Sequence, residues 1–291
     1  MTTIIKKVKF KILEYFELIK FEHTIFALPF ALSGMLLAKP DSWPQINTFL
    51  WVIVAMIGGR TAAMALNRVI DADIDKKNPR TANRAIPTGK IKKMSALFLA
   101  IFSFGLLIFA TWQLPLVCKQ LLPVAIAILI VYSYTKRFTN LSHLVLGSAL
   151  GAAAAGGWIA VSSEITLPVI LWGLAIVFWV GGFDIIYAIQ DIEFDKTNNL
   201  FSIPAWLGIK NSLLIAKIFH STTVLLLIIL GSIYPVGLFY WIGLILTGVL
   251  LIYENSLLKE DDLSKINAAF FNVNGYVSIS FFIFIFLDKI F

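Results

Sequence analysis

Long apolar runs separated by short polar segments extend along the whole chain. Runs of about 20 apolar residues have the length at which a helix crosses the hydrocarbon core of a bilayer. Runs of this kind lie at roughly residues 20–38, 47–70, 94–113, 116–135, 142–162, 166–189, 211–232, 235–253 and 267–288. The pattern therefore predicts an all-α polytopic membrane protein with nine transmembrane helices in a single domain over residues 1–291.

The composition excludes an ordinary soluble domain. Hydrophobic residues make up 59% of the chain and charged residues only 14%, whereas soluble domains average about 25% charged residues. A transmembrane barrel would show short strands of alternating polarity instead. Ahead of the first span, residues 6–16 mix lysines with Phe10, Leu13 and Phe16, which predicts a short amphipathic helix on the membrane surface.

The net charge of +7 follows the loops. Most of the basic residues lie before the first span or after an even-numbered span, as in the stretches 6–20, 76–93 and 136–137. The positive-inside rule places these loops and the N-terminus in the cytoplasm, and the C-terminus outside. We interpret the charge as a topology signal of an integral protein of a bacterial inner membrane, not as a nucleic-acid-binding surface.

The second span ends in the polar sequence NRVIDADID, residues 67–75. Asn67, Asp71 and Asp75 stand four residues apart, and residues four apart share one face of a helix, about 6 Å apart along its axis. If the helix continues to residue 75, the amide and both carboxylates form one polar stripe. Asp73 then points elsewhere.

A second polar stripe closes the sixth span, in the sequence DIIYAIQDIEFD. Asp184, Tyr187, Asp191 and Asp195 are spaced by three, four and four residues, so they also share a helix face. Both stripes end even-numbered spans. We therefore expect them to converge at a central cavity that opens to the cytoplasmic side.

Clustered carboxylates need a neutralising cation, because each charge inside a membrane costs ~2.5 kcal/mol or more near the helix centre. Mg²⁺ takes one or two carboxylates together with waters and substrate phosphate oxygens, so two facing stripes can hold a Mg²⁺-bound diphosphate. Basic side chains that can donate to its remaining oxygens are Arg80, Arg84, Lys136 and Arg137. The alternative is that the carboxylates only pair with neighbouring lysines and arginines.

At these residues the sequence resembles the UbiA superfamily of intramembrane prenyltransferases, most closely its 4-hydroxybenzoate polyprenyltransferases. The superfamily signature NxxxDxxxD and its following loop correspond to NRVIDADID and RTANRAIPTG, and the second signature corresponds to DIIYAIQDIEFD. The sequence YSYTKR after the fourth span matches as well. The resemblance implies Mg²⁺-assisted transfer of a polyprenyl group from polyprenyl diphosphate to a small aromatic acid in quinone biosynthesis.

The resemblance also implies roles for individual residues. The metal would be held by Asn67, Asp71, Asp75, Asp191 and Asp195. The diphosphate would contact Arg80, Arg84, Lys136 and Arg137. Tyr187 would lie beside the reacting carbon as a catalytic residue, and the aromatic acceptor would contact Lys20, His23 and Asp184.

Two departures from the superfamily pattern leave the acceptor open. The first span carries Lys20, His23 and Thr24 where many members have Arg-x-x-Lys/Arg-Pro, and Ala85 replaces a proline in the loop. The acceptor is therefore 4-hydroxybenzoate or, as the alternative, a dihydroxynaphthoate of menaquinone synthesis. An ion-coupled transporter is the competing class, but transporters place their charges near the membrane midplane on broken helices.

Other conspicuous residues have simpler interpretations. Arg60, inside the second span, is expected to snorkel toward the outer face along its long stem. His143 is expected to have a packing or capping role. Gly147 and Gly151 predict a close approach between two membrane helices.

Overall fold

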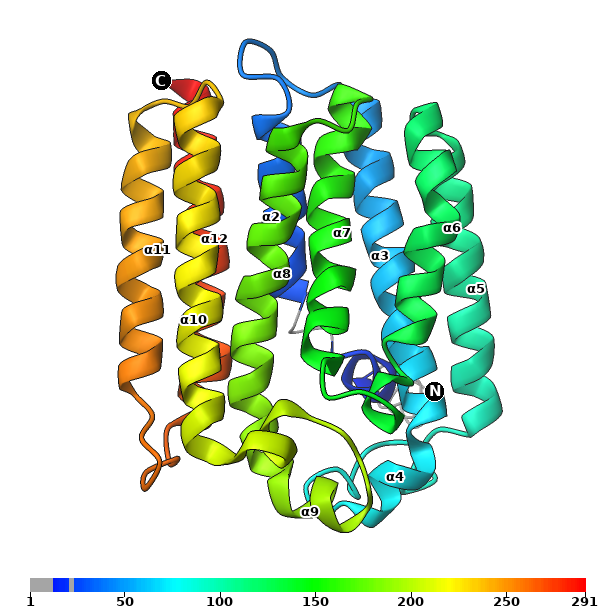
Figure 1. The fold of residues 1–291 in the computed structure, drawn as a ribbon. Helices are drawn as coiled ribbons and strands as arrows, with labels where there is room; N and C mark the ends of the chain where they lie inside the picture. The colour runs from blue at the N-terminus through cyan, green and yellow to red at the C-terminus, as the bar shows by residue number, and fades with distance from the viewer. Residues whose placement is uncertain (1–12, 21–23) are drawn as a thin grey trace, which may run out of the picture.

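The computed structural model describes residues 13–20 and 24–291, and the regular structure of this part of the chain is helical (Figure 1). Its α-helices are α2 (Thr24–Leu37), α3 (Ile46–Ile70), α4 (Ala72–Lys77), α5 (Lys93–Trp112), α6 (Leu116–Val131), α7 (Ser142–Ser162), α8 (Leu167–Ala188), α9 (Ile192–Thr197), α10 (Ile203–Ile233), α11 (Leu238–Ser256) and α12 (Asn274–Ile290). Two 3₁₀ turns, η2 (Thr135–Arg137) and η3 (Ile189–Asp191), and a π-helical segment, η4 (Ala268–Val273), are also present. The predicted all-α class is confirmed.

The helices coincide with the predicted spans. In the described residues, seven helices are long and apolar enough to cross a membrane, and two shorter apolar helices, Phe26–Leu37 and Leu116–Val131, lie at the first and fourth predicted spans. The prediction of a polytopic membrane protein is therefore confirmed. Of the predicted amphipathic segment 6–16, residues 6–12 lie outside the described part of the chain, and residues 13–16 belong to a helical stretch that ends at residue 18.

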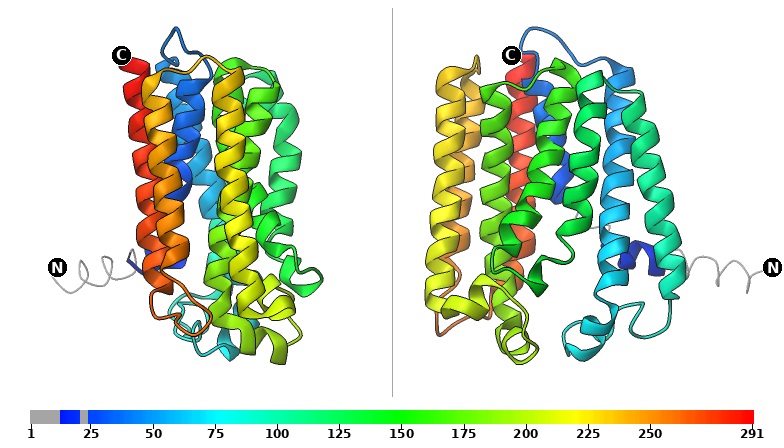
Figure 2. Two further views of the ribbon diagram at one scale, coloured as in Figure 1. Left: turned by 60° about the vertical axis from the view of Figure 1, so that its left-hand side comes forward. Right: turned by 45° about the vertical axis from the view of Figure 1, so that its right-hand side comes forward.

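Helix α8 forms the centre of the bundle and packs against α7 and α10 (Figures 1 and 2). More than half of its apolar side chains are buried, including Trp172, Trp179 and Phe183. A Cβ atom added to Gly147 or Gly151 of α7 would lie 2.4 Å or 2.6 Å from a carbonyl oxygen of α8. The predicted close approach at these glycines is confirmed, as expected where helices associate by tight packing within lipid.

Both acidic segments lie at one end of the bundle, which we call the motif end. It carries α4 and α9, and the C-terminus lies at the opposite end (Figure 1). The helix is interrupted within each acidic segment, whereas the polar stripes derived from the sequence require a continuous helix. Helix α3 ends at Ile70, and Asp71 separates it from α4, while the turn η3 separates α8 from α9.

The start of α10 also differs from the prediction. The helix begins at Ile203 instead of residue 211, because Ser202 caps its N-terminus by accepting a hydrogen bond from the Ala205 amide. Gly208 then kinks the helix with a positive φ of 75°, a conformation that glycine adopts without steric cost. The early start brings Ser202 and Ile203 to the motif end.

Candidate active site

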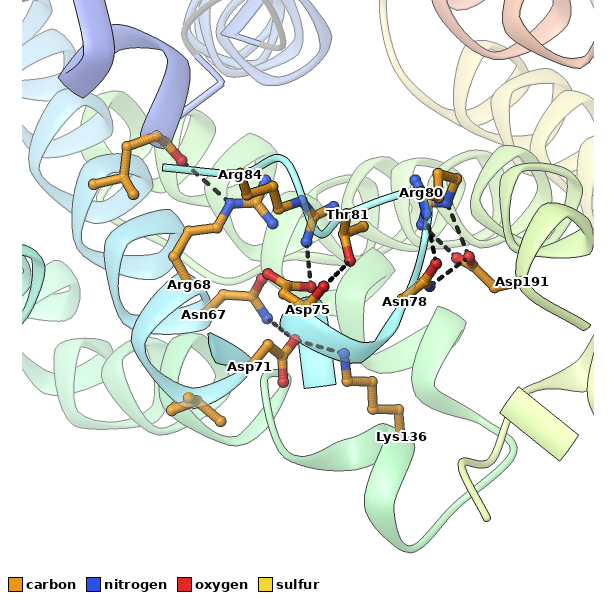
Figure 3. A network of polar contacts seen from close by, with 12 residues as sticks. Asn67, Arg68, Asp71, Asp75, Asn78, Arg80, Thr81, Arg84, Lys136 and Asp191 are labelled. Atoms are coloured by element: carbon orange, nitrogen blue, oxygen red, sulfur yellow. Dashed lines mark hydrogen bonds and ion pairs between the residues drawn. The ribbon is translucent and has the colours of Figure 1, made fainter. Parts of the chain in front are cut away.

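Asp71 is a buried carboxylate held from two sides. It is 3% exposed, accepts a hydrogen bond from Asn67 Nδ2 at 3.1 Å and forms an ion pair with Lys136 Nζ at 2.6 Å (Figure 3). It also forms an ion pair with Arg137 Nη2 at 2.9 Å. Arg137 Nη2 also donates to the carbonyl of Ile70, where α3 ends. The connection between α6 and α7 therefore supplies the cations for this carboxylate.

Asp75 is equally buried but keeps one oxygen unused. Its Oδ1 forms an ion pair with Arg84 Nη1 at 2.7 Å, and its backbone carbonyl accepts a hydrogen bond from Thr81 (Figure 3). Its Oδ2 is buried and has no hydrogen-bond partner among the described residues. Since a buried polar atom normally has a partner, this oxygen is available to a further ligand.

Arg80 joins the two acidic segments. From the loop after α4 it donates to both oxygens of Asp191, through Nε at 2.9 Å and through Nη2, and its Nη1 donates to the Tyr187 hydroxyl at 2.9 Å. The side-chain amide of Asn78 donates to Asp191 Oδ1, the oxygen that also accepts from Arg80 Nε, at 2.9 Å (Figure 3). The predicted convergence of the two segments is thus present, and the contacts that make it come from this loop.

The charge of Arg80 is secured by these contacts. Burial acts to lower the pKa of its guanidinium, but the hydrogen bond to Asp191 and the charge of that carboxylate outweigh burial, so the pKa lies above its ordinary value. The guanidinium also lies 5.0 Å from the centre of the Tyr187 ring. A permanent, oriented cation therefore lies between the two acidic segments.

Asp195 and Asp184 have neither lysine nor arginine as a hydrogen-bond partner among the described residues. Asp195 Oδ2 accepts a hydrogen bond from the Ser202 hydroxyl at 2.9 Å. Asp184 Oδ2 lies 2.7 Å from Nδ1 of His143, a buried residue in the first turn of α7. The backbone amide of Ile203 approaches the other ring nitrogen of His143, at 3.3 Å.

The residues predicted for the acceptor are only partly placed. His23 lies outside the described residues. Lys20 has a positive φ of 48°, and its carbonyl accepts a hydrogen bond from Arg60 Nη2 at 3.0 Å. Residue 20 starts the first predicted span, so the expectation that Arg60 points to the outer face is wrong. The guanidinium instead reaches a backbone carbonyl at the start of that span.

An aromatic surface adjoins the polar groups. Tyr187 stacks on Phe270 of η4 with ring centres 4.1 Å apart, and Phe270 meets Phe183 and Phe26 edge-on at 5.3 Å and 5.7 Å. These three phenylalanines are buried. The site therefore has a charged side, formed by the two acidic segments, and a dry aromatic side beyond Tyr187.

The donor set fits a hard divalent cation that also binds phosphate. Within the described part of the chain, no three His, Cys, Asp or Glu residues form a ready-made metal cluster, so protein carboxylates alone would not complete a coordination sphere. Mg²⁺ requires only one or two carboxylates when waters and phosphate oxygens supply the rest. The unused Oδ2 of Asp75 and the oxygens of Asp71, Asp191 and Asp195 provide that number in each segment.

Pairing of the carboxylates with lysines and arginines, the alternative interpretation of the acidic segments, is also present in the structure. Asp71, Asp75 and Asp191 are each paired with a basic side chain. The cations that form these pairs are those predicted to bind diphosphate: Arg80, Arg84, Lys136 and Arg137. Carboxylates and cations therefore lie together at the motif end, and a bound metal diphosphate can exchange partners with both.

Three site residues were missed by sequence reasoning. Asn78 precedes a proline and its Oδ1 accepts from the Arg80 amide at 2.9 Å, an Asx-type turn that the Asn-Pro pair signals. Ser202 is a typical N-cap residue before Pro204. His143 was assigned a packing or capping role, and nothing in its local sequence points to its contact with Asp184.

The chain matches known proteins over most of its length. The model of the UbiA prenyltransferase family matches residues 27–280. A 4-hydroxybenzoate octaprenyltransferase of Janthinobacterium sp. (strain Marseille) is 31% identical over 261 residues, covering 89% of this chain and 88% of that protein.

Solved structures share the fold. The apo structure of a UbiA homolog from Aeropyrum pernix K1 has a TM-score of 0.83 and 34% sequence identity, covering 92% of this chain and 98% of that chain. A UbiA homolog from Archaeoglobus fulgidus bound to GPP and Mg²⁺ has a TM-score of 0.76 at 18% identity, covering 96% and 100%. The resemblance found in the motifs is confirmed over most of the chain.

Proposed function

Because this chain belongs to the UbiA prenyltransferase family, we propose that it transfers a polyprenyl group from polyprenyl diphosphate to an aromatic acid of the 4-hydroxybenzoate kind. The observation that carries the proposal is the meeting of both acidic segments through Arg80, beside an aromatic surface that begins at Tyr187. Relatives named 4-hydroxybenzoate octaprenyltransferase support the choice of acceptor.

The diphosphate would bind at the motif end. Arg80, Arg84, Lys136 and Arg137 would donate to its oxygens, because guanidinium and ammonium groups form charge-assisted hydrogen bonds to phosphate. Mg²⁺ held by Asp71, Asp75, Asp191 and Asp195, with Asn67 orienting the first pair, would stabilise the charge that builds on the leaving group. An Archaeoglobus fulgidus protein of the same fold is bound to GPP and Mg²⁺.

The reaction would proceed by ionisation of the allylic C–O bond, whose electron pair leaves with the diphosphate. A ring carbon of the acceptor then forms the new C–C bond with the allylic cation, while the acceptor hydroxyl gives its proton to Asp184. The ring hydrogen is lost to water as aromaticity returns and the hydroxyl regains a proton, so one proton is released overall. The rings of Tyr187 and Phe270 keep water from the cation.

The distribution of basic loops supports a cytoplasmic position for this site, with the N-terminus on the same side and the C-terminus outside. The prenyl tail would extend between the helices toward the lipid, and the chain from residue 1 to 291 would act as one domain. Lys20, His23 and Asp184 would meet the acceptor. The departures at Lys20, His23 and Ala85 keep dihydroxynaphthoate as the second candidate acceptor.

The test is a prenylation assay with protein in lipid nanodiscs and radiolabelled geranyl diphosphate. 4-Hydroxybenzoate and dihydroxynaphthoate are offered separately, each with Mg²⁺ or with EDTA. We expect a Mg²⁺-dependent lipophilic product with 4-hydroxybenzoate that Asp71→Asn and Asp191→Asn variants do not form. If only dihydroxynaphthoate gives a product, dihydroxynaphthoate is the acceptor and 4-hydroxybenzoate is not. Failure of folded protein to bind geranyl diphosphate would refute the function.

A further inference from the structure

We propose that His143 is a positioning residue that holds the carboxylate of Asp184 in a fixed orientation toward the aromatic acceptor. The two side chains come from neighbouring helices, α7 and α8, and lie 2.7 Å apart between His143 Nδ1 and Asp184 Oδ2. The inference deepens the proposed function and rests on it, because it gives a role to the residue beside the reacting ring.

The hydrogen-bond partners determine which ring nitrogen carries the proton. The backbone amide of Ile203, which can only donate, lies 3.3 Å from His143 Nε2. Nε2 must therefore accept, and a neutral imidazole then carries its proton on Nδ1. That proton points at the Asp184 carboxylate, so the ring is held between a donor on α10 and an acceptor on α8.

Burial makes this arrangement rigid. His143 is 3% exposed, while the Asp184 side chain is 23% exposed. A hydrogen bond to an ionised carboxylate is stronger than one between neutral groups, and the buried imidazole has both nitrogens engaged. His143 thus fixes one carboxylate oxygen of Asp184, and the other has no hydrogen bond from a described residue, which leaves it for a ligand.

The position of Asp184 connects the pair with the reacting groups. It precedes Tyr187 by three residues on α8, so the two side chains share a helix face, and Tyr187 accepts a hydrogen bond from Arg80. A carboxylate fixed at this point can accept the hydrogen bond of an acceptor hydroxyl. Its orientation matters because a small misplacement of a reacting group reduces the rate strongly.

The start of α10 extends the same network to the second acidic segment. Ile203 donates to His143, and its neighbour Ser202 donates to Asp195. One helix N-terminus therefore supports the carboxylate proposed for the acceptor and a carboxylate proposed for the metal. His143 is the member of this network that acts on the acceptor side.

The chain offers a matched control in His220. This residue of α10 is also a buried imidazole, 2% exposed, and it pairs with the Asn255 amide at 2.8 Å. Replacing either histidine by leucine removes the same kind of buried ring. The variants therefore separate the cost of losing a buried imidazole from the loss of the contact with Asp184.

Kinetics with both substrates give the first test. We expect His143→Leu to lower kcat/KM for the aromatic acceptor by about ten- to a hundredfold, the range of loss when a group that orients a metal ligand is replaced, with an unchanged KM for geranyl diphosphate. His143→Gln, which keeps a donor and an acceptor, should recover part of the loss. His220→Leu should change the melting temperature alone. Equal kinetic effects of the two leucine variants would overturn the inference.

A measurement that does not depend on activity gives the second test. In protein labelled with ¹⁵N-histidine, NMR should show His143 with its proton on Nδ1, and Asp184→Asn should shift that signal while leaving His220 unchanged. A proton on Nε2, or a signal insensitive to Asp184→Asn, would refute the contact whatever the activity. Wild-type protein that makes no prenylated product would refute the function, and the NMR result would still decide the contact.

Discussion

The two acidic segments have the same spacing of carboxylates but differ in the exposure of these carboxylates and in their basic partners. Asp71 and Asp75 are each 3% exposed and are paired with Lys136, Arg137 and Arg84. In the second segment, the Asp191 side chain is 16% exposed and is bound by Arg80. Its companion Asp195, half-buried, accepts a hydrogen bond from a serine hydroxyl.

The difference shows that the segments are not interchangeable. The first segment is neutralised by the loop that follows it and by the connection between α6 and α7, so its carboxylates are already fixed. The second segment takes its cation from the loop of the first, through Arg80. We infer that the second segment depends on Arg80 for its position, whereas the first segment has cations of its own.

The largest effect is expected at Asp71, the buried carboxylate with two basic partners. Asp71→Asn should lower the rate of prenyl transfer about a thousandfold, because it removes a metal-binding charge and leaves Lys136 and Arg137 without their anion. Asp73→Asn is the matched control, since that side chain is 92% exposed. Initial rates of both variants test the expectation. Similar rates would show that Asp71 matters no more for catalysis than the exposed Asp73.

The next effect is expected at the link between the segments. Arg80→Lys should weaken binding of Mg²⁺–geranyl diphosphate about a hundredfold, because an ammonium group cannot contact both Asp191 oxygens and the Tyr187 hydroxyl together. Arg84→Lys, which changes a single contact to Asp75, should weaken it less. Calorimetric titration measures both variants. A larger loss for Arg84→Lys would assign the decisive cation to the first segment.

A smaller effect should separate the metal requirements of the segments. Asp195→Asn should raise the Mg²⁺ concentration for half-maximal activity about tenfold, because a neutral amide is a weaker ligand for a hard cation. Asp75→Asn is compared in the same titration, since its Oδ2 is the unused buried oxygen. If Asp195→Asn leaves the Mg²⁺ dependence unchanged, the second segment does not hold a metal through this residue.

The smallest effect is expected at the support of Asp195. Ser202→Ala removes the hydroxyl that donates to this carboxylate and should lower activity several-fold, at or below the roughly tenfold cost usual for residues that orient a ligand. Ser232→Ala, on the same helix but bound to its own backbone at Ile228, serves as control. Steady-state rates should separate the two, and equal rates would show that Asp195 needs no support.

Much of the site could be predicted from the sequence because its determinants are local. The i, i+4 spacing placed Asn67 beside Asp71, and their hydrogen bond is present. The positions of Arg84 and Arg137 in neighbouring loops indicated cations near the carboxylates, predicted there as diphosphate ligands, and both form ion pairs with the first segment. The first stripe was predicted on the condition that the helix continues to residue 75, and the structure interrupts the helix at Asp71 and, in the second segment, at η3. The periodicity carries no information about either turn.

The sequence alone therefore determined the class of protein, the course of its helices and the identity of its charged residues, because apolar length and residue spacing are local properties of the chain. The tertiary structure decided which carboxylate meets which cation. Arg80 and Asp191 are 111 residues apart, and His143 and Asp184 are 41 apart on different helices. Such contacts depend on how closely the helices pack and how they are rotated, and no local pattern records either.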